Sequence, residues 1–215
     1  MGKITVVIAK EGKKIIYFLL VFNLLAILLW ASNVINYSIL ILMIGALLFC
    51  LNFFRDPKRI PPDGSNLIIS PADGKVIRVD IIDDEKLGEV YAISIFLNIF
   101  NVHVNRMPLN GSILDIKYNE GKFLLAFNHK ACDENERNTI ELMTEIGRVR
   151  IIQITGLLAR RIICYANKGQ NMLMGERLGF MLFGSRIDLM IPSSIKIKIK
   201  PGQKVIGNQS IIGTY

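Results

Sequence analysis

The chain begins with a long apolar stretch that differs sharply from everything after it. From Ile15 to Phe54 the sequence contains no Asp, Glu, Lys or Arg. Two apolar runs fill this stretch, residues 15–31 (IIYFLLVFNLLAILLWA) and 34–51 (VINYSILILMIGALLFCL), separated by Ser32 and Asn33. A bilayer core requires roughly 20 apolar residues per helix, with about 17 as the lower limit. The pattern therefore predicts a membrane-embedded hairpin of two helices.

The charges around the two runs predict which way this hairpin faces. Four lysines precede the first run, Arg55, Lys58 and Arg59 follow the second, and the turn between the runs is uncharged. Because positive flanks are retained in the cytoplasm, we expect both ends on the cytoplasmic side of the cell (inner) membrane. A buried helix pair and a shallow re-entrant hairpin are the alternatives. A cleaved signal peptide is disfavoured, since no small-residue cleavage site follows either run.

The remaining sequence is dominated by short apolar runs bounded by Gly, Pro, Asn and Asp. Residues 195–200 (IKIKIK) alternate strictly, which is typical of a strand with one buried face. Only residues 122–131 have some helical character. So many short strands with frequent turns predict a mainly β domain of sandwich or barrel type. The other expected strands are residues 67–69, 75–82, 90–97, 111–118, 139–144, 148–155 and 161–166.

Two segments of this β-rich region resemble each other. Residues 71–77 (PADGKVI) and 200–207 (KPGQKVIG) both place a glycine shortly before a Lys-Val-Ile strand. The second resembles half of a lipoyl-type sandwich, which points to a fold rather than to a function. We therefore expect two parts, a membrane hairpin over residues 1–54 and a β-rich catalytic domain over residues 55–215.

Composition narrows the possible partners. The formal net charge is +8 with 26 Lys and Arg, but these are spread along the chain and do not form one basic run. Together with the apolar stretch, this favours lipid over nucleic acid as the partner. The three cysteines are widely spaced, so they predict neither a disulfide framework nor a metal site. No glycine-rich phosphate loop and no Gly-x-Ser-x-Gly motif is present.

Four short segments carry the strongest functional signal. They are residues 53–57 (FFRDP), 70–74 (SPADG), 100–111 (FNVHVNRMPLNG) and 183–188 (FGSRID). In this order along the chain, they resemble the short bacterial and archaeal type of phosphatidylserine decarboxylase, as does the apolar hairpin in front of them. Residues 135–138 (NERN) and 156–161 (GLLARR) look like further signatures of that family.

The resemblance implies a self-cleaving precursor. In this family the chain breaks at a Gly-Ser bond, here between Gly184 and Ser185, and the serine becomes a covalent pyruvoyl group. That group forms a Schiff base with the amine of phosphatidylserine, and phosphatidylethanolamine and carbon dioxide are the products. No other cofactor and no metal is implied. Chains 1–184 and 185–215 would stay together as a heterodimer, and a higher homo-oligomer is possible.

The resemblance also suggests helpers for Ser185. Asp73 and His103 would act as a pair that removes the serine proton and holds the imidazole in a useful tautomer. Longer relatives have two histidines three residues apart before Met-Pro, whereas this chain has His103 and Arg106. Arginine cannot act as a general base, so either His103 serves both self-cleavage and decarboxylation, or cleavage uses another base. Arg106 is expected to bind the substrate carboxylate or phosphate. His129 lies outside the signatures and is expected on the surface.

Two other functions fit part of the pattern. A non-enzymatic, membrane-tethered β-sandwich would explain the hairpin and the repeated Gly-Lys-Val-Ile segments, but not the context of Gly184 and Ser185. A pyruvoyl decarboxylase acting on a soluble amino acid would explain that context, but not the hairpin. The resemblance favours the lipid enzyme.

Overall fold

A computed structural model of the chain describes residues 6–121, 135–156, 161–182 and 185–215. These residues form two compact units, Met1–Lys58 and Arg59–Tyr215. The expected helical residues 122–131, His129 and Gly184 lie outside the described residues.

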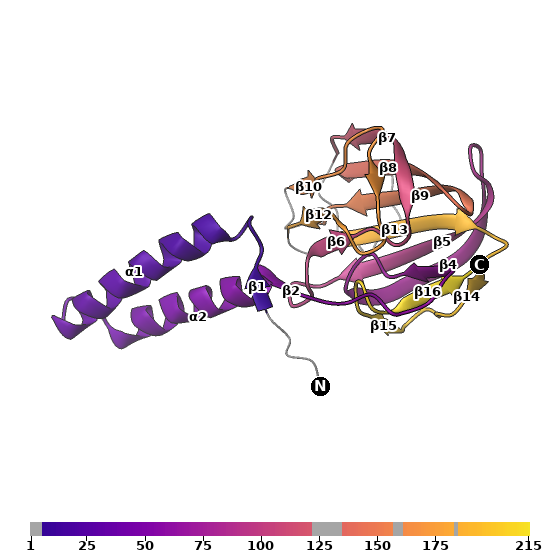
Figure 1. Cartoon of the computed structure of the whole chain (residues 1–215). Coiled ribbons are helices and arrows are strands. Elements are labelled where there is room, and N and C mark those ends of the chain that lie inside the picture. Colours follow the sequence, from indigo (N-terminus) through magenta and orange to yellow (C-terminus); the bar gives the residue numbers. More distant parts are fainter. Residues whose placement is uncertain (1–5, 122–134, 157–160, 183–184) are drawn as a thin grey trace. The chain divides into compact units, whose positions relative to one another are not determined.

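The first unit contains two apolar helices (Figure 1). Helix α1 spans Lys13–Ala31 and α2 spans Tyr37–Phe53, while β1 (Val6–Ile8) pairs antiparallel with β2 (Arg55–Pro57). Helix α2 begins later than the apolar run because Asn36 caps it, accepting a hydrogen bond from the Ser38 backbone N–H at 3.1 Å. Asn23 lies within α1 and donates to the Met43 carbonyl of α2 at 3.3 Å. A polar side chain inside the apolar run therefore helps to join the two helices.

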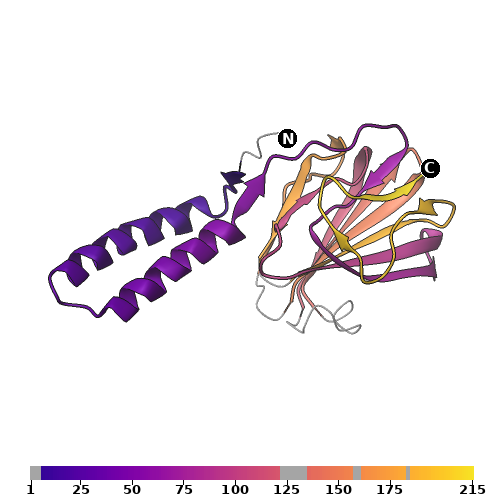
Figure 2. The ribbon, with the colours of Figure 1, turned by 90° about the horizontal axis from the view of Figure 1, so that it is seen from below.

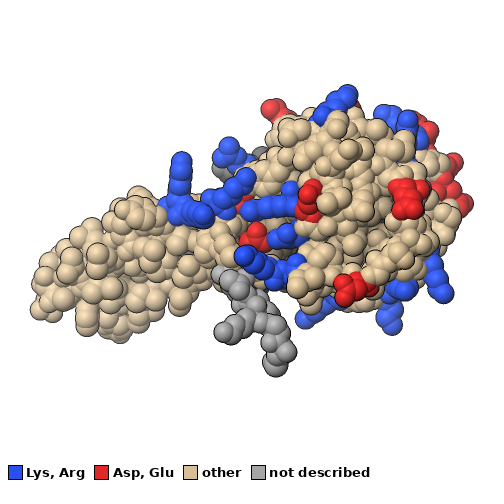
Figure 3. All heavy atoms as spheres, viewed as in Figure 1, with Lys and Arg blue, Asp and Glu red and all other residues tan. Residues whose placement is uncertain are grey.

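The surface of the two helices is apolar. Figure 3 shows no acidic or basic side chain along most of their length. Phe18 is 58% exposed and Leu42 is 73% exposed, although side chains of this kind are normally buried in water-soluble proteins. Helix α1 is long and apolar enough to cross a membrane, and α2 is shorter. The first unit thus has the surface expected of a membrane-embedded hairpin.

The second unit is built from strands, which confirms the mainly β prediction. A curled antiparallel sheet of eight strands has the order β11-β7-β8-β9-β13-β5-β4-β15 (Figure 2). Two smaller sheets have the orders β10-β12-β6 and β14-β16-β3. The strands are β3 (Leu67–Ile69), β4 (Gly74–Asp84), β5 (Gly88–Leu97), β6 (Val104–Arg106), β7 (Gly111–Asn119), β8 (Arg137–Thr144), β9 (Gly147–Ile154), β10 (Ile162–Cys164), β11 (Asn171–Met172), β12 (Arg177–Met181), β13 (Ser185–Pro192), β14 (Lys196–Ile197), β15 (Lys204–Val205) and β16 (Ile211–Thr214).

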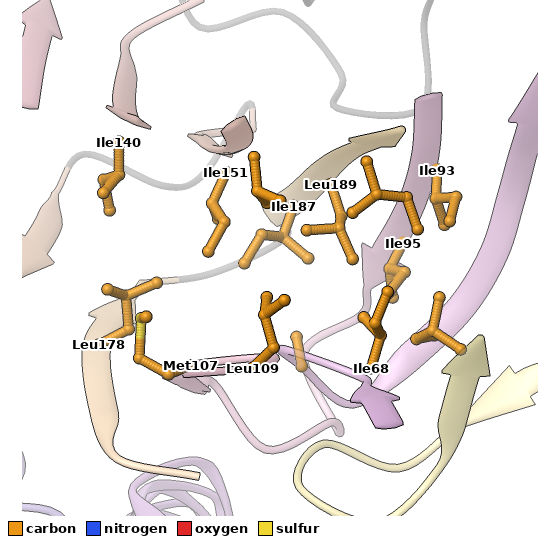
Figure 4. Packing of buried hydrophobic residues seen from close by; sticks show 14 of the residues in the cluster. Ile68, Ile93, Ile95, Met107, Leu109, Ile140, Ile151, Leu178, Ile187 and Leu189 are labelled. Carbon is orange, nitrogen blue, oxygen red and sulfur yellow. The ribbon is translucent and has the colours of Figure 1, made fainter. Parts of the chain in front are cut away.

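The hydrophobic core lies on one face of the eight-stranded sheet. Alternate residues of β8, β9 and β13 point to this face, including Ile140, Ile151 and Ile187. Figure 4 shows them facing Leu178 of β12 and Met107, which follows β6. All five side chains are fully buried. The opposite face carries mainly charged and polar residues, so the sheet has one dry and one wet side.

Most expected strands are present, with two kinds of difference. The alternating segment 195–200 forms only the two-residue strand β14, because it turns at once toward Pro201 and Gly202. Strands β6, β11, β12, β13 and β16 were not predicted as strands. The lipoyl-type character of the fold stays a prediction.

Candidate active site

Ser185 is the first residue of β13, in the middle of the large sheet. Its backbone is paired with Leu97 of β5. Side chains alternate along a strand, so Ser185 points to the same face as Ile187 and Leu189, which is the core face. Its side chain is fully buried, and its Oγ has no hydrogen-bond partner among the described residues. A hydroxyl held in a dry site without a partner is a candidate reactive group.

His103 lies just before β6 and is fully buried. Its backbone carbonyl accepts a hydrogen bond from the Met181 N–H at 3.1 Å, which extends the β6–β12 ladder by one residue. Its ring Nδ1 is 2.9 Å from the Asn101 carbonyl oxygen. A carbonyl can only accept, so Nδ1 carries a hydrogen and Nε2 is the basic nitrogen of the neutral ring. The local backbone therefore selects the tautomer.

Strand pairing brings the segments of His103 and Ser185 to one end of the domain. Met181, which bonds to His103, stands four residues before Ser185 in the sequence. Leu97, which pairs with Ser185, stands six residues before His103. The residues just before Ser185 are thus hydrogen-bonded to His103, and the residues just before His103 are paired with Ser185.

Asp73 stands at the start of β4, on the other side of β5 from Ser185. The next residue, Gly74, packs so closely on β5 that a Cβ there would lie 2.3 Å from the Phe96 carbonyl oxygen. Strands are spaced about 4.8 Å apart, so the backbones of Asp73 and Ser185 are about 10 Å apart across β5. Asp73 therefore lies near the site without being next to Ser185 along the sheet.

The Asp73 carboxylate is held by two groups that sequence reasoning did not single out. Arg59 forms an ion pair with Asp73 Oδ1, and its Nη2 donates to Oδ2 at 2.9 Å. The Gly207 N–H donates to Oδ1 at 2.8 Å, and Arg59 also donates to the Gly207 carbonyl at 2.9 Å. Asp73 thus joins Arg59, near the start of the domain, to Gly207, near its end.

Arg106 points away from the core face. Its neighbour Asn105 bonds to the core-side residue Gln153, and adjacent side chains of a strand lie on opposite faces. Arg106 Nη1 donates to the Gly175 carbonyl at 3.1 Å, and its backbone pairs with Arg177 of β12. The structure therefore places Arg106 and Ser185 on surfaces that do not face each other.

A chain of buried amides crosses the core face next to Ser185. Asn138 Nδ2 donates to Gln153 Oε1 at 3.0 Å, and Gln153 Nε2 donates to Asn105 Oδ1 at 2.8 Å. Gly179 leaves room for this chain, because a Cβ there would lie 2.7 Å from Gln153 Nε2. Sequence reasoning missed the chain, although Asn105 and Asn138 lie within two of the quoted motifs. The available signal was Gln153, a polar residue within the predicted strand 148–155.

A second polar group borders the amide chain. Asn135 donates to the Thr155 carbonyl at 2.7 Å, and Thr155 Oγ1 donates to the Glu136 carbonyl at 3.2 Å. Tyr118 donates its hydroxyl hydrogen to Glu136 Oε1 at 2.8 Å. This bond to a carboxylate is the main reason that the pKa of Tyr118 is raised to about 12. Residues 135–138 thus anchor the edge of the site.

A cleft of the domain lies away from Ser185. It has a volume of about 520 Å³ and is on the wet face of the large sheet, where Asp188 and Met190 of β13 line it. Side chains alternate between the two faces along β13, so Ser185 lies on the face opposite to Asp188 and Met190 and points away from this cleft. The buried polar layer on the core face is therefore the better candidate for a reactive site. The described residues contain no group of three or more His, Cys, Asp or Glu that could hold a metal ion.

Known proteins of one family match most of the chain. A family model described as phosphatidylserine decarboxylase matches residues 46–213. The chain belongs to the phosphatidylserine decarboxylase family. It is 46% identical over 171 residues to the phosphatidylserine decarboxylase proenzyme of Chlorobaculum tepidum, covering 79% of each chain. It is 43% identical over 212 residues to the proenzyme of that name from Syntrophus aciditrophicus, covering 97% of each chain.

Membership of the phosphatidylserine decarboxylase family confirms the resemblance seen in the sequence. The matched region contains Ser185, His103, Asp73 and Arg106, whose individual roles stay predictions. The polar layer on the core face joins Asn105, two residues after His103, to Asn138 of the 135–138 segment. Arg59 and the buried amides add to the site residues that the motifs suggested.

The Tyr118–Glu136 bond makes a prediction about ionisation. Glu136→Gln removes the carboxylate that opposes loss of the Tyr118 proton, so the pKa of Tyr118 should fall from about 12 toward its ordinary value of 10.0. Ultraviolet titration of the protein with and without Tyr118→Phe isolates this one phenol. Tyr215, whose pKa is raised by burial and by Glu145, should not respond to Glu136→Gln. An unchanged Tyr118 titration would show that Glu136 is not its partner in solution.

Proposed function

We propose that the chain is a phosphatidylserine decarboxylase that activates itself by breaking the Gly184–Ser185 bond. Membership of the family and the name of its relatives support the decarboxylase activity, and the word proenzyme in that name supports processing. The observation that carries the proposal is the buried Ser185 hydroxyl, which has no hydrogen-bond partner among the described residues.

The proposed cleavage uses groups of the chain itself. Ser185 Oγ attacks the Gly184 carbonyl carbon, the C–N bond breaks, and the acyl group moves from nitrogen to oxygen as an ester. Loss of the Ser185 α-hydrogen then expels the Gly184 carboxylate and leaves dehydroalanine at residue 185. Hydrolysis of that residue by water releases ammonia and leaves a pyruvoyl group. A base must take the hydroxyl proton, and Asp73 and His103 are the proposed helpers.

The pyruvoyl group would supply an electrophilic carbonyl that binds the substrate amine and accepts the electron pair left when carbon dioxide departs. The surroundings of Ser185 suit such a group. The position is buried, and its neighbours on the core face are apolar or hydrogen-bonded amides. His103 is the proposed donor of the proton that completes the product, because Nδ1 is held by Asn101 and Nε2 is the nitrogen left to carry that proton.

The two products of cleavage should remain one protein. Residues 185–215 include β13, which pairs with β5 on one side and β9 on the other. They also include β15, paired with β4, and β16, paired with β3. The Asp73 bond to the Gly207 N–H adds a further link between the chains. We therefore propose a heterodimer of residues 1–184 and 185–215.

We further propose that the apolar helices hold the enzyme at the inner face of the cell membrane. Helix α1 has the length and composition for this, and both helices expose apolar side chains. A phospholipid substrate gives a reason for such an anchor, because its acyl chains remain in the bilayer. The catalytic domain would then lie on the cytoplasmic side.

The first test of processing is Ser185→Ala. Without the hydroxyl there is no nucleophile, so this variant should remain a single chain on a denaturing gel, whereas the unsubstituted protein should give two. Ser194→Ala is the matched control, because Ser194 is exposed and lies just beyond β13. The control should process normally. Two chains from Ser185→Ala would disprove the cleavage assignment.

A second test separates turnover from cleavage. In His103→Ala the proton donor is missing, so carbon dioxide release should fall by at least about 100-fold, a typical effect of losing a general acid. Cleavage occurs only once, so the variant can be left to mature until mass spectrometry shows the pyruvoyl chain. Activity is then expressed per pyruvoyl group. Near-normal release would remove His103 from the decarboxylation step.

A third test concerns the anchor. A variant without residues 1–52 should still self-cleave, since no residue assigned to cleavage lies there. Its turnover of phosphatidylserine in vesicles should fall much more than its turnover of a short-chain, water-soluble analogue. Equal losses on the two substrates would mean that the hairpin supports the fold and not access to lipid.

A further inference from the structure

The chain of buried amides ends in an unused hydrogen-bond donor. Asn105 is fully buried, and its Oδ1 accepts from Gln153 Nε2, while Gln153 Oε1 accepts from Asn138. These bonds fix the orientation of each amide, because turning Asn105 around would set two NH₂ groups against each other. Asn105 Nδ2 is therefore the free end of the chain. It has no hydrogen-bond partner among the described residues.

A buried donor without an acceptor is costly, and proteins rarely keep one without a use. Ser185 Oγ is a second buried polar atom in the same situation. Both lie on the core side of the large sheet, one at the end of the amide chain and the other at the start of β13. Two such atoms in one dry layer indicate a place where a polar ligand or a reacting group is expected.

Strand pairing places Ser185 close to the residue that holds Asn105. Gln153 is directly opposite Ile187 of β13, and both point to the core face. Ser185 precedes Ile187 by two residues on the same face, which is about 7 Å along the strand. Asn105 is hydrogen-bonded to Gln153. Ser185 and the Gln153–Asn105 pair therefore belong to the same layer of the core.

We propose that Asn105 Nδ2 donates a hydrogen bond to an anionic oxygen at the Ser185 site. The inference rests on the proposed function, which supplies two such oxygens. One is the oxygen of the Gly184 carbonyl, which becomes negative when Ser185 attacks it. The other is the carboxylate of the substrate. Both are oxygens on a carboxyl-type carbon, and a donor fixed in a dry site stabilises such a charge strongly.

Asn105→Asp is the most informative substitution. Aspartate keeps the shape of the side chain and an oxygen for the Gln153 N–H, but it replaces the free NH₂ with an acceptor. Loss of one oxyanion donor typically slows a reaction about 100- to 1,000-fold. Ile140→Val is the matched control, because it weakens the same core by trimming a fully buried side chain on β8 without touching a polar group.

The experiment has two arms on the full-length protein. The first follows splitting of the newly made chain by gel and gives the cleavage rate. The second uses protein matured to completion and measures carbon dioxide release from phosphatidylserine vesicles per pyruvoyl group. Slower cleavage alone assigns the donor to the Gly184 oxygen, and slower turnover alone assigns it to the substrate carboxylate. Losses of about 100-fold in both arms assign it to both.

Two additional readouts distinguish a donor from a structural residue. Burial raises the pKa of an introduced carboxyl, and its protonated form is again a donor. The defect of Asn105→Asp relative to the unsubstituted protein should therefore shrink as pH falls. Gln153→Glu provides a second route if Asn105→Asp does not fold. It keeps the acceptor for Asn138 but turns the Asn105 amide away from Ser185, and it should cause the same loss.

The proposal is overturned if Asn105→Asp and Gln153→Glu both stay within about twofold of Ile140→Val in both arms. Failure of the proposed function looks different. In that case the unsubstituted, fully matured protein would itself release no carbon dioxide from phosphatidylserine, while the cleavage arm would still decide the role of Asn105.

Discussion

The pairing of β13 between β9 and β5 is the constraint on which the rest of the structure depends. The two ladders fix β13 in the middle of the large sheet and decide which of its side chains enter the core. Ser185 is thereby turned to the dry face, while Arg186 and Asp188 are turned to the other face. These two form a buried bidentate ion pair, with Nη2 to Oδ2 at 2.6 Å. Their mutual neutralisation lets a charged sequence run through the centre of a sheet.

The pairing of β13 with β9 also places a polar residue inside the core, because Gln153 lies opposite Ile187 on the core face. A domain optimised only for stability would fill the layer beside Ser185 with apolar side chains, since buried polar groups are costly unless all their bonds are satisfied. Here Asn138, Gln153 and Asn105 cross that layer, and Gly179 makes space for them. Such a network rigidifies its members, so it can hold a donor and a nucleophile in fixed positions before any reaction begins.

The sequence allowed part of this to be predicted. The two long apolar runs were strong enough to indicate the helices, and the many short apolar runs bounded by turn residues were strong enough to indicate the mainly β fold. Strand β13 was missed because Arg186 and Asp188 look unlike a buried strand until their ion pair is seen. Ser185 and His103 could be found from the motifs. The Arg59–Asp73–Gly207 group could not, because it joins residues far apart in the sequence, and only the folded chain brings them together.

The central claim is that the buried Ser185 hydroxyl is converted into the group that carries out the chemistry. The most direct test is the intact mass of the small chain isolated from the full-length protein after processing. A chain of residues 185–215 that begins with a pyruvoyl group is lighter by one ammonia than the same peptide beginning with serine, and it resists stepwise degradation from its N-terminus. The account predicts this lighter, blocked chain. A chain that begins with free serine would contradict it.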